Sequence, residues 1–309
     1  MILSSILFNI LLFILGLIFL IRGSDLFIER LKLIAKKMGV SEFVVGAILA
    51  SVATTLPEIS VSIISSLQGE SSLAIGNALG SVLFNISVIL GVSSLIMPIK
   101  VDEKGWKNSL LLFCISIIFG FAAIDRYLSR WEGLILLILY GIFVKRTLKG
   151  EWANQKEHKK KILVRDIVYV FITGGIVVLG SKLLVDSAVF FARMLKISEM
   201  IIGLTIVASG TSLPEFVNTI TSIRKKTPNI GVGNIIGACI LNILIVSGVA
   251  ILINPVILAK KFLYLALPII LLIVLALTIS LKRDNIIGRK TGLIFLVLYA
   301  LFFILNWRI

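Results

Sequence analysis

Cysteine and histidine are scarce in this chain of 309 residues, which contains two cysteines, Cys114 and Cys239, and one histidine, His158. Both cysteines stand in apolar runs without metal-ligand spacing, so we expect two buried free thiols and no disulfide. His158 lies in the basic run QKEHKKK, and we interpret it as a solvated loop residue. The shortage of soft ligands excludes the donor sets typical of zinc and copper centres.

Acidic residues are also few, with 16 against 31 lysines and arginines and a formal net charge of +15. In a soluble protein this excess would indicate nucleic acid as a partner. Here 58% of the residues are hydrophobic and the mean hydropathy is +1.09. Many apolar runs approach the roughly 20 residues that a spanning helix needs. We therefore predict a membrane protein without a nucleic-acid partner, whose basic residues lie in loops and set its topology.

Long apolar runs recur along the whole chain and predict an all-α polytopic membrane protein with ten transmembrane helices. The first run, Met1–Ile21, has neither a basic n-region nor a small-residue cleavage site, so we interpret it as a retained span. The predicted spans cover residues 4–22, 42–67, 72–98, 109–124, 131–145, 166–190, 197–222, 229–255, 262–281 and 291–307.

Basic residues alternate between the connections that join these spans. The odd-numbered connections hold most of them, in the runs ERLKLIAKK at 29–37, KEHKKK at 156–161, RKK at 224–226 and KRDNIIGRK at 282–290. The second connection, LQGESS at 67–72, holds none. The positive-inside rule therefore places the odd connections in the cytoplasm and both termini outside the cell membrane.

The chain divides in two near its middle, at its only long polar stretch. We expect a first five-helix repeat at 1–148, a cytoplasmic linker at 149–165 and a second five-helix repeat at 166–309. A solvated linker explains the charge run in this stretch, and a membrane-surface or regulatory helix is the alternative.

The two halves align without a gap from Gly23 to Gly91 when the sequence is shifted by 157 residues. TTLPE at 54–58 then falls on TSLPE at 211–215, and GNALGSVLFN at 76–85 falls on GNIIGACILN at 233–242. Fixed spacing over this length indicates duplication. Because each half has an odd number of predicted spans, the second enters the membrane from the opposite side. Such inverted repeats are typical of secondary transporters, whose sites lie near the midplane between the repeats.

Two glutamates lie deep inside apolar spans, and each directly follows a proline. They are Glu58 after Pro57 and Glu215 after Pro214, and every other acidic residue lies near a span end or in a connection. A charged side chain at mid-bilayer costs roughly 2.5–3.5 kcal/mol, and proline leaves carbonyls of the preceding turn without a partner. The matched pairs therefore indicate a functional site.

Hard oxygen donors accompany both glutamates. The candidate ligands besides Glu58 and Glu215 are the hydroxyls of Thr54, Thr55, Ser81, Thr211 and Ser212, the backbone oxygens of Ser51 and Ala208, and the amides of Asn85 and Asn242. Such donors suit Ca²⁺ and other hard cations. Two neighbouring buried carboxylates repel each other or become protonated, so either a bound cation or a proton resolves the conflict.

Other features of the spans that follow the glutamates are interpreted as packing. Gly76 with Gly80, and Gly233 with Gly237, form GxxxG pairs that favour close helix contact. The asparagines of the GN motifs, Asn77 and Asn234, are interpreted as caps or interhelical polar contacts.

These motifs resemble the sodium/calcium exchanger family of the cation/calcium antiporter superfamily, particularly its prokaryotic members. TTLPE with GNALGSVLFN, and GTSLPE with GNIIGACILN, are similar to the family's two alpha-repeats in order and spacing. The resemblance implies exchange of Na⁺ for Ca²⁺ by alternating access at one central cluster, with Glu58 and Glu215 as principal ligands. It also implies that the first spans of the two halves slide together. Both ions bind as substrates, and we expect a lipid-embedded monomer with no cofactor and no enzyme activity.

The sequence departs from the family pattern at a few positions. Ala238 stands where the first half has Ser81, and Asn242 stands where some members carry Asp. One Ca²⁺ or two Na⁺ neutralise the two remaining carboxylates. An H⁺/Ca²⁺ antiporter of the same superfamily, a cation channel and a non-transporting scaffold are the alternative hypotheses.

Overall fold

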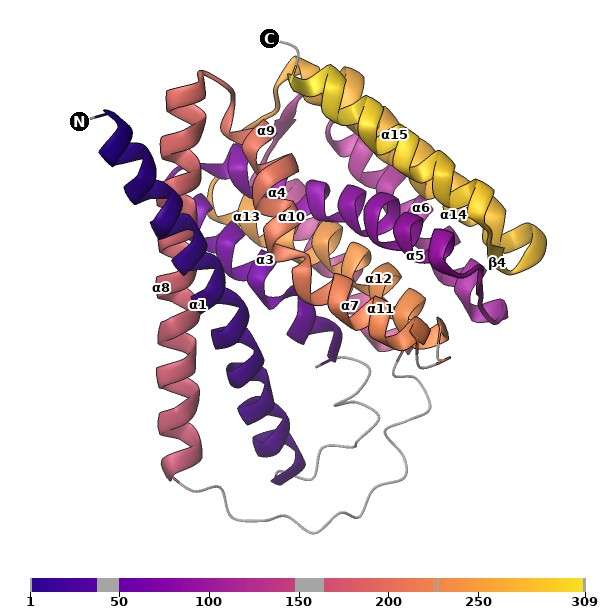
Figure 1. The fold of residues 1–309 in the computed structure, drawn as a ribbon, viewed down its shortest axis with the longest axis horizontal. Helices are drawn as coiled ribbons and strands as arrows, with labels where there is room; N and C mark the ends of the chain where they lie inside the picture. Colours follow the sequence, from indigo (N-terminus) through magenta and orange to yellow (C-terminus); the bar gives the residue numbers. More distant parts are fainter. Residues whose placement is uncertain (1, 38–49, 148–163, 225, 227, 308–309) are drawn as a thin grey trace.

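The computed structural model of the chain is almost entirely helical and describes residues 2–37, 50–147, 164–224, 226 and 228–307 (Figure 1). Within these residues, seven helices are long and apolar enough to cross a membrane. The number is eight if residues 199–211 and 213–224, which meet at a bend of 46°, form one span. The prediction of a polytopic α-helical membrane protein is therefore confirmed.

The helices follow the apolar runs of the sequence, and four of those runs contain a π-helical turn, labelled η. The first half contains α1 (Ile2–Lys37), α3 (Ala50–Leu67), α4 (Ser71–Phe84), η2 (Asn85–Leu90), α5 (Gly91–Ile96), β1 (Ile99–Lys100), α6 (Glu103–Ala122), β2 (Tyr127–Leu128) and α7 (Arg130–Thr147). The second half contains α8 (Val164–Leu195), α9 (Glu199–Ile202), η3 (Gly203–Val207), α10 (Ala208–Thr211), α11 (Leu213–Arg224), α12 (Pro228–Leu241), η4 (Asn242–Val246), α13 (Ser247–Ile253), β3 (Val256–Ile257), η5 (Phe262–Ala266), α14 (Leu267–Asp284), β4 (Ile286–Ile287) and α15 (Arg289–Trp307).

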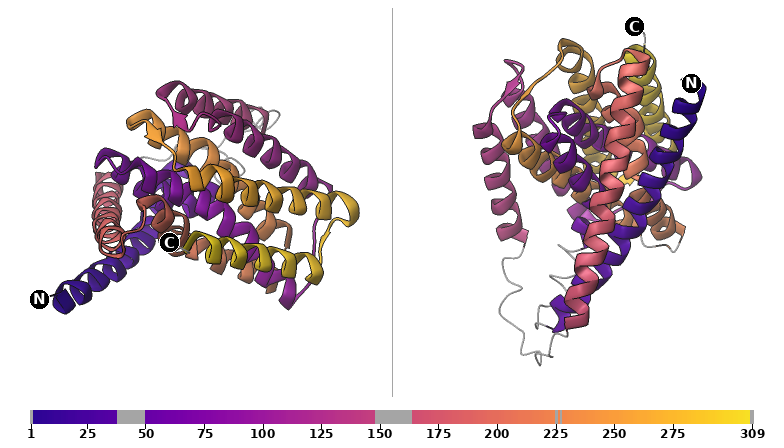
Figure 2. Two further views of the ribbon diagram at one scale, coloured as in Figure 1. Left: turned by 90° about the horizontal axis from the view of Figure 1, so that it is seen from above. Right: turned by 90° about the vertical axis from the view of Figure 1, so that its left-hand side faces the viewer.

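The two longest helices, α1 and α8, lie side by side along one edge of the molecule and extend beyond the other helices (Figures 1 and 2). They cross at Gly16 and Gly180, where there is no room for a side chain. A Cβ atom on Gly180 would lie 2.6 Å from the backbone nitrogen of Leu20 and 2.9 Å from the carbonyl oxygen of Gly16. The two backbones are therefore in direct contact at this crossing.

Elements of one half pair with elements of the other. Strand β1 pairs with β4 and strand β2 pairs with β3, both antiparallel. Helix α5 meets α15 at Gly91 and Gly292, and α7 meets α13 at Gly133 and Gly248. The halves consequently interlock and share one large apolar core, which the segments from α4 to α5 and from α12 to α13 cross.

Close packing at the first GxxxG pair is confirmed. A Cβ atom on Gly76 would lie 2.4 Å from the carbonyl oxygen of Met200, and one on Gly80 would lie 2.5 Å from that of Leu204. These contacts press α4 against the second half just before its glutamate motif. For Gly233, the described residues place no atom within 4 Å of such a Cβ.

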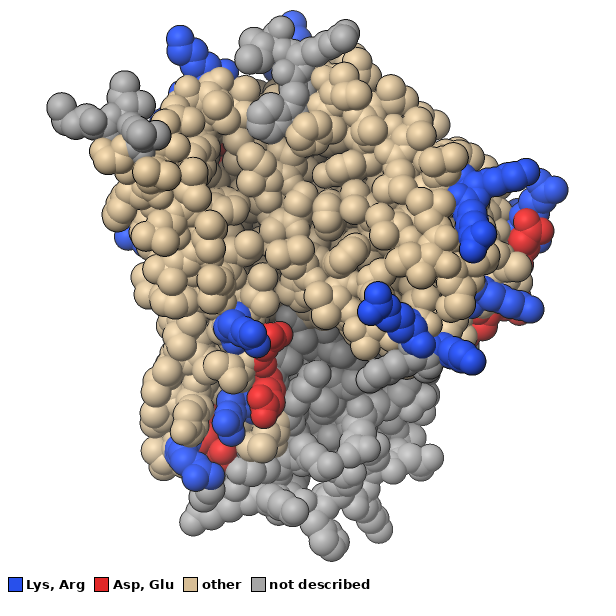
Figure 3. Space-filling model, in the orientation of Figure 1, with Lys and Arg blue, Asp and Glu red and all other residues tan. Residues whose placement is uncertain are grey.

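The outer surface matches a membrane environment. Figure 3 shows a broad uncharged face over the bundle, with basic side chains gathered at the edge where α14 turns through β4 into α15. Lys282 and Arg283 lie in the last turn of α14. This distribution places charge at the rim of an apolar belt, where water and lipid headgroups can solvate it.

Some sequence-based expectations differ from the structure. The run ERLKLIAKK at 29–37, predicted as a connection, continues helix α1, because lysine, leucine and alanine favour helix beyond the apolar span. Helix α8 likewise extends past the predicted limits of 166–190. Cys239 is buried, but Cys114 is exposed, since an apolar span presents similar residues to lipid and to the core. Most of the predicted linker at 149–165, including His158, lies outside the described residues.

Candidate ion-binding site

The two Pro–Glu pairs lie in helices of different shape. Pro57 lies inside the continuous helix α3, and Glu58 follows it. In the second half, the helix breaks at Ser212, and Pro214 and Glu215 lie in the first turn of α11. A proline in the first turn of a helix costs little, because its missing N–H would have no partner there. The helix that carries the motif is therefore continuous in the first half and broken in the second, where the two segments meet at 46°.

Glu58 is completely buried and receives hydrogen bonds from both halves of the molecule. The hydroxyl of Ser212, from the second half, donates to its Oε1 at 3.0 Å. The hydroxyl of Ser81, from α4 in the first half, donates to the same oxygen at 3.3 Å. Its Oε2 atom has no hydrogen-bond partner. The structure thus brings three predicted ligands together at the interface between the halves.

Glu215 is also completely buried, and neither of its carboxylate oxygens has a hydrogen-bond partner within standard geometric limits. Thr54 lies beside this carboxyl group, and Glu58 is close enough to interact with it electrostatically. A buried carboxylate needs donors or a cation to offset its desolvation. The pair of acids, with three of its four oxygens lacking a hydrogen bond, is therefore a suitable binding site for a cation.

Two asparagine–threonine hydrogen bonds connect the halves around the acids. The hydroxyl of Thr211 donates to Oδ1 of Asn77 at 3.1 Å. The hydroxyl of Thr54 donates to Oδ1 of Asn234 at 3.4 Å. The interpretation of both asparagines as interhelical contacts is confirmed, and these contacts hold the two candidate threonines in place.

Asn85, Asn242 and Thr55 are buried and make no side-chain hydrogen bond. Asn85 begins the π-helical turn η2, and Asn242 begins η4 at the matched position of the second half. A π-helical turn inserts one extra residue into a helix and is frequent at functional sites. The two amides therefore offer oxygen atoms that no protein donor occupies.

The predicted backbone ligands are the carbonyl oxygens of Ser51 and Ala208. The carbonyl oxygen of Ala208 accepts hydrogen bonds from the N–H of Ser212 at 3.1 Å and from the hydroxyl of Thr211 at 3.3 Å. The expectation of an unpaired carbonyl at Ala208 is thus wrong in this structure, because α10 keeps its helical bonds up to the break. Ser51 lies in α3, and its side chain is outside the described residues. Ala238 is buried and supplies no hydroxyl.

Two buried hydroxyls near the acids were missed by the sequence analysis. Ser62 lies four residues after Glu58, and Thr219 lies four residues after Glu215. The same shift of 157 residues that aligns the glutamates also aligns these hydroxyls. A search for polar residues on the glutamate face of the helix, one turn onward, would have found both.

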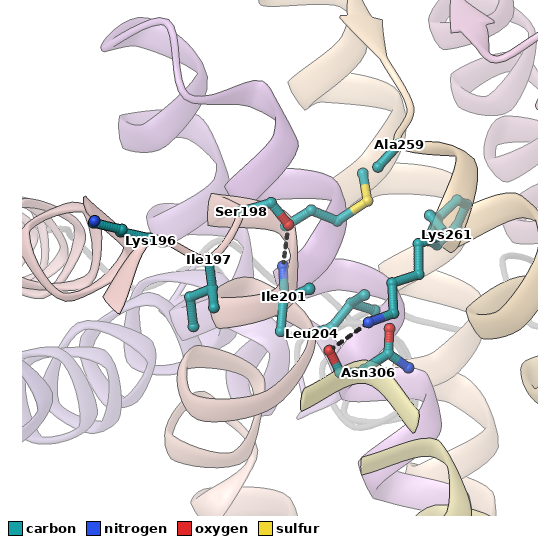
Figure 4. Close-up of a pocket in the computed structure, with 10 residues that line it drawn as sticks. Lys196, Ile197, Ser198, Ile201, Leu204, Ala259, Lys261 and Asn306 are labelled. Atoms are coloured by element: carbon teal, nitrogen blue, oxygen red, sulfur yellow. Dashed lines mark hydrogen bonds between the residues drawn. The ribbon is translucent and has the colours of Figure 1, made fainter. Parts of the chain in front are cut away.

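The candidate site lies apart from a cavity of about 200 Å³ near the start of α9 (Figure 4). Lys261 reaches into this cavity and donates from its Nζ atom to the carbonyl oxygen of Asn306 at 2.8 Å. Neither glutamate lines the cavity. Among the described residues there is also no cluster of three or more His, Cys, Asp or Glu side chains that could hold a metal. The two acids and the neutral oxygens around them therefore make up the candidate site.

Comparisons with known proteins show which proteins the chain is similar to. A family model described as sodium/calcium exchanger protein matches residues 8–148 and 166–308. The sodium/calcium exchanger MaX1 of Methanosarcina acetivorans is 32% identical, over 97% of this chain and 99% of that protein. Uncharacterized membrane protein MJ0091 of Methanocaldococcus jannaschii is 36% identical, over 94% and 95%. A solved structure of the sodium-calcium exchanger NCX_Mj, soaked with 10 mM Na⁺ and 10 mM Sr²⁺, is 33% identical with a TM-score of 0.67, over 98% of this chain and 100% of that one.

Proposed function

Because the chain belongs to the sodium/calcium exchanger protein family, we propose that it is a cell-membrane antiporter that exchanges Na⁺ for Ca²⁺ by alternating access. One observation carries this proposal: the buried Glu58 carboxylate lies between hydroxyls of both halves, with the second buried acid, Glu215, beside it. Two adjacent carboxylates buried among neutral oxygens favour binding of a divalent cation.

The proposed ligand set explains why the two ions would exchange. Glu58 and Glu215 supply two negative charges, which one Ca²⁺ or two Na⁺ neutralise. Because both kinds of ion use the same carboxylates, binding of one excludes the other, and each crossing of the membrane carries one kind. The neutral members of the set are Thr54, Thr55, Ser51, Ser81, Asn85, Thr211, Ser212, Ala208 and Asn242, of which Ala208 would have to exchange its present hydrogen bonds for an ion.

The proposal includes an architecture of ten spans in two inverted repeats, at 1–148 and 166–309, joined by a cytoplasmic linker at 149–165. The family model matches two ranges with nearly these limits, which supports the division. The reciprocal pairs β1–β4 and β3–β2 support a two-fold relation between the repeats, because the 157-residue shift carries β1 onto β3. Both termini lie outside, and α1 with α8 slides to open the site alternately to the two sides.

Transport of ⁴⁵Ca²⁺ into proteoliposomes tests the proposal. Uptake should require Na⁺ inside the vesicles and should stop when the Na⁺ gradient is dissipated. A pH gradient alone should drive no uptake. Variants in which Glu58 or Glu215 is replaced by glutamine have a matched control in Glu103→Gln, which makes the same chemical change at an exposed acid on α6. Uptake driven by the pH gradient, or uptake that needs no counter-ion, would contradict Na⁺ coupling.

A further inference from the structure

In the first half, hydrogen bonds of Asn77 fasten α3, the helix that carries Glu58, to the following helix α4. Its Nδ2 atom donates to the backbone oxygen of Glu58 at 3.3 Å and to the hydroxyl of Ser62 at 3.2 Å. The Ser62 hydroxyl in turn donates to the carbonyl oxygen of Ala74 at 3.2 Å. Helices α3 and α4 are therefore joined by a continuous set of buried hydrogen bonds beside the ion site.

The equivalent fastening is open in the second half. Asn234 and Thr219 occupy the positions that match Asn77 and Ser62. The Nδ2 atom of Asn234 and the hydroxyl of Thr219 both lack a hydrogen-bond partner, and Thr219 is completely buried. The second half thus has an unpaired donor, Nδ2 of Asn234, and an unpaired acceptor, the Thr219 hydroxyl, which could bond to each other. A Cβ atom on Gly231, the residue that matches Ala74, would lie 3.3 Å from the Thr219 carbonyl oxygen, so the two helices are already adjacent.

A second bond is missing in the same half. In the first half, the Ser212 hydroxyl donates to the Glu58 carboxylate at 3.0 Å. The matched residues are Thr55 and Glu215, and the hydroxyl of one and the carboxylate of the other both lack partners. Each buried polar group without a partner carries an uncompensated desolvation penalty. A rearrangement that joins these complementary groups would recover that free energy.

Of these groups, Thr219 and the Glu215 carboxylate lie on α11, the helix that follows the break at Ser212, whereas Asn234 lies on α12 and Thr55 on α3. Helix α11 carries Glu215 and Thr219 and is bent by 46° from the preceding segment. The matched helix α3 is continuous, and its Ser62 is hydrogen-bonded to α4. The bend therefore coincides with the loss of the fastening.

We propose that Asn234 and Thr219 are positioning residues that fasten α11 to α12 in a second transport state. In that state, Asn234 Nδ2 donates to the Thr219 hydroxyl, the Thr219 hydroxyl donates to the Gly231 carbonyl, and the Thr55 hydroxyl donates to the Glu215 carboxylate. The hydrogen bonds of Asn77 and Ser62 loosen as these form. The inference depends on the proposed alternating access, since it assigns the present structure to one of the two states.

Hydrogen exchange of the α11 amides, measured on the full-length protein in detergent with Na⁺ and without Ca²⁺, tests this inference. Ser62→Ala weakens the hydrogen bonds between α3 and α4 in the present state. Helix α11 should then spend more time bonded to α12, and its amides should exchange more slowly. Thr219→Val removes the fastening of the second state, so α11 should exchange faster. Each change should be about two- to tenfold, as expected for the loss of one hydrogen bond.

The double variant distinguishes this role from a purely structural one. Ser62→Ala with Thr219→Val should return α11 exchange toward the wild-type rate, because the two changes bias the equilibrium in opposite directions. Thr219→Ser keeps the hydroxyl and should behave as wild type. In transport assays, Thr219→Val should slow maximal Ca²⁺ uptake with little change in the half-saturating Ca²⁺ concentration.

Three results would overturn the inference. They are unchanged α11 exchange in Thr219→Val, single variants that shift exchange in the same direction, and a double variant more perturbed than either single one. A loss of Ca²⁺ affinity without a change in maximal rate would also overturn it, since that would place Thr219 among the ligands. Hydrogen exchange does not depend on flux, so failure of this inference is distinguishable from failure of Na⁺-driven transport.

Discussion

The two halves of this protein carry the same Pro–Glu motif, yet they hold its glutamate in different ways. Glu58 lies in a continuous helix and accepts two hydroxyl hydrogen bonds. Glu215 lies after a 46° break and accepts none within standard geometric limits, although Thr54 lies beside it. Duplicated residues therefore supply matched chemistry without matched geometry. One ion site built from two such halves has unequal hydrogen bonding at its two acids, and four predictions test how far this difference matters.

The largest expected effect is the loss of transport on neutralising either acid. Glu58→Gln and Glu215→Gln should each reduce Na⁺-driven ⁴⁵Ca²⁺ uptake about 100-fold or more, because each removes half of the ligand charge at a buried site. Expression should persist, since neutralisation also removes a desolvation cost. Near-normal uptake in either variant would contradict a shared two-glutamate site, and Glu103→Gln should transport normally.

The next effect compares matched glycines on the two long helices. Gly180→Ala should destabilise the protein by roughly 1–3 kcal/mol, because the new methyl group meets the backbone of α1 at 2.6–2.9 Å. Gly23→Ala, at the matched position, should cost less, since the nearest atoms are side-chain methyl carbons of Ile176 and Val177 at 3.0–3.1 Å rather than backbone atoms at 2.6–2.9 Å. Thermal unfolding in detergent measures both. Equal losses would show that the crossing is no tighter in one half than in the other.

A smaller effect concerns stability without bound ions. Glu215→Gln should raise the melting temperature in ion-free buffer more than Glu58→Gln does. Both substitutions remove a buried charge, but the Glu58 change also weakens two hydrogen bonds to a charged acceptor. The ranking should disappear at saturating Ca²⁺. A larger gain for Glu58→Gln would mean that its hydroxyl bonds contribute little.

The smallest effect concerns the one hydroxyl that the second half lacks. Ala238→Ser should lower the Na⁺ concentration that half-displaces bound Ca²⁺ by about two- to fivefold, the effect of roughly one added polar contact. Ca²⁺ affinity should change less, because Ca²⁺ accepts flexible coordination and readily keeps a water. Ser81→Ala should weaken Na⁺ binding instead. If Ala238→Ser leaves the displacement unchanged, position 238 does not face the ion.

The sequence predicted the chemistry of the site better than its geometry. Glu58 and Glu215 stood out because a buried charge and a proline are each costly in a membrane span, and the 157-residue shift joined them. The break at Ser212 was beyond such reasoning, since both halves carry closely similar Pro–Glu motifs and only one of the two helices is broken. The paired carbonyl at Ala208 was missed for the same reason. Helix ends were misjudged because membrane thickness determines only the length of the apolar span, and the helix can continue beyond it.

The backbone contact between Gly16 and Gly180 has a mechanical consequence. With no side chain between them, the two backbones pack closely, and we expect α1 and α8 to move as one rigid body. In the proposed cycle, one movement of the α1–α8 pair would close the ion site to one face of the membrane and open it to the other. The rigidity of a single sliding part would then prevent simultaneous opening to both faces, and with it a leak of ions, without any signal between two gates.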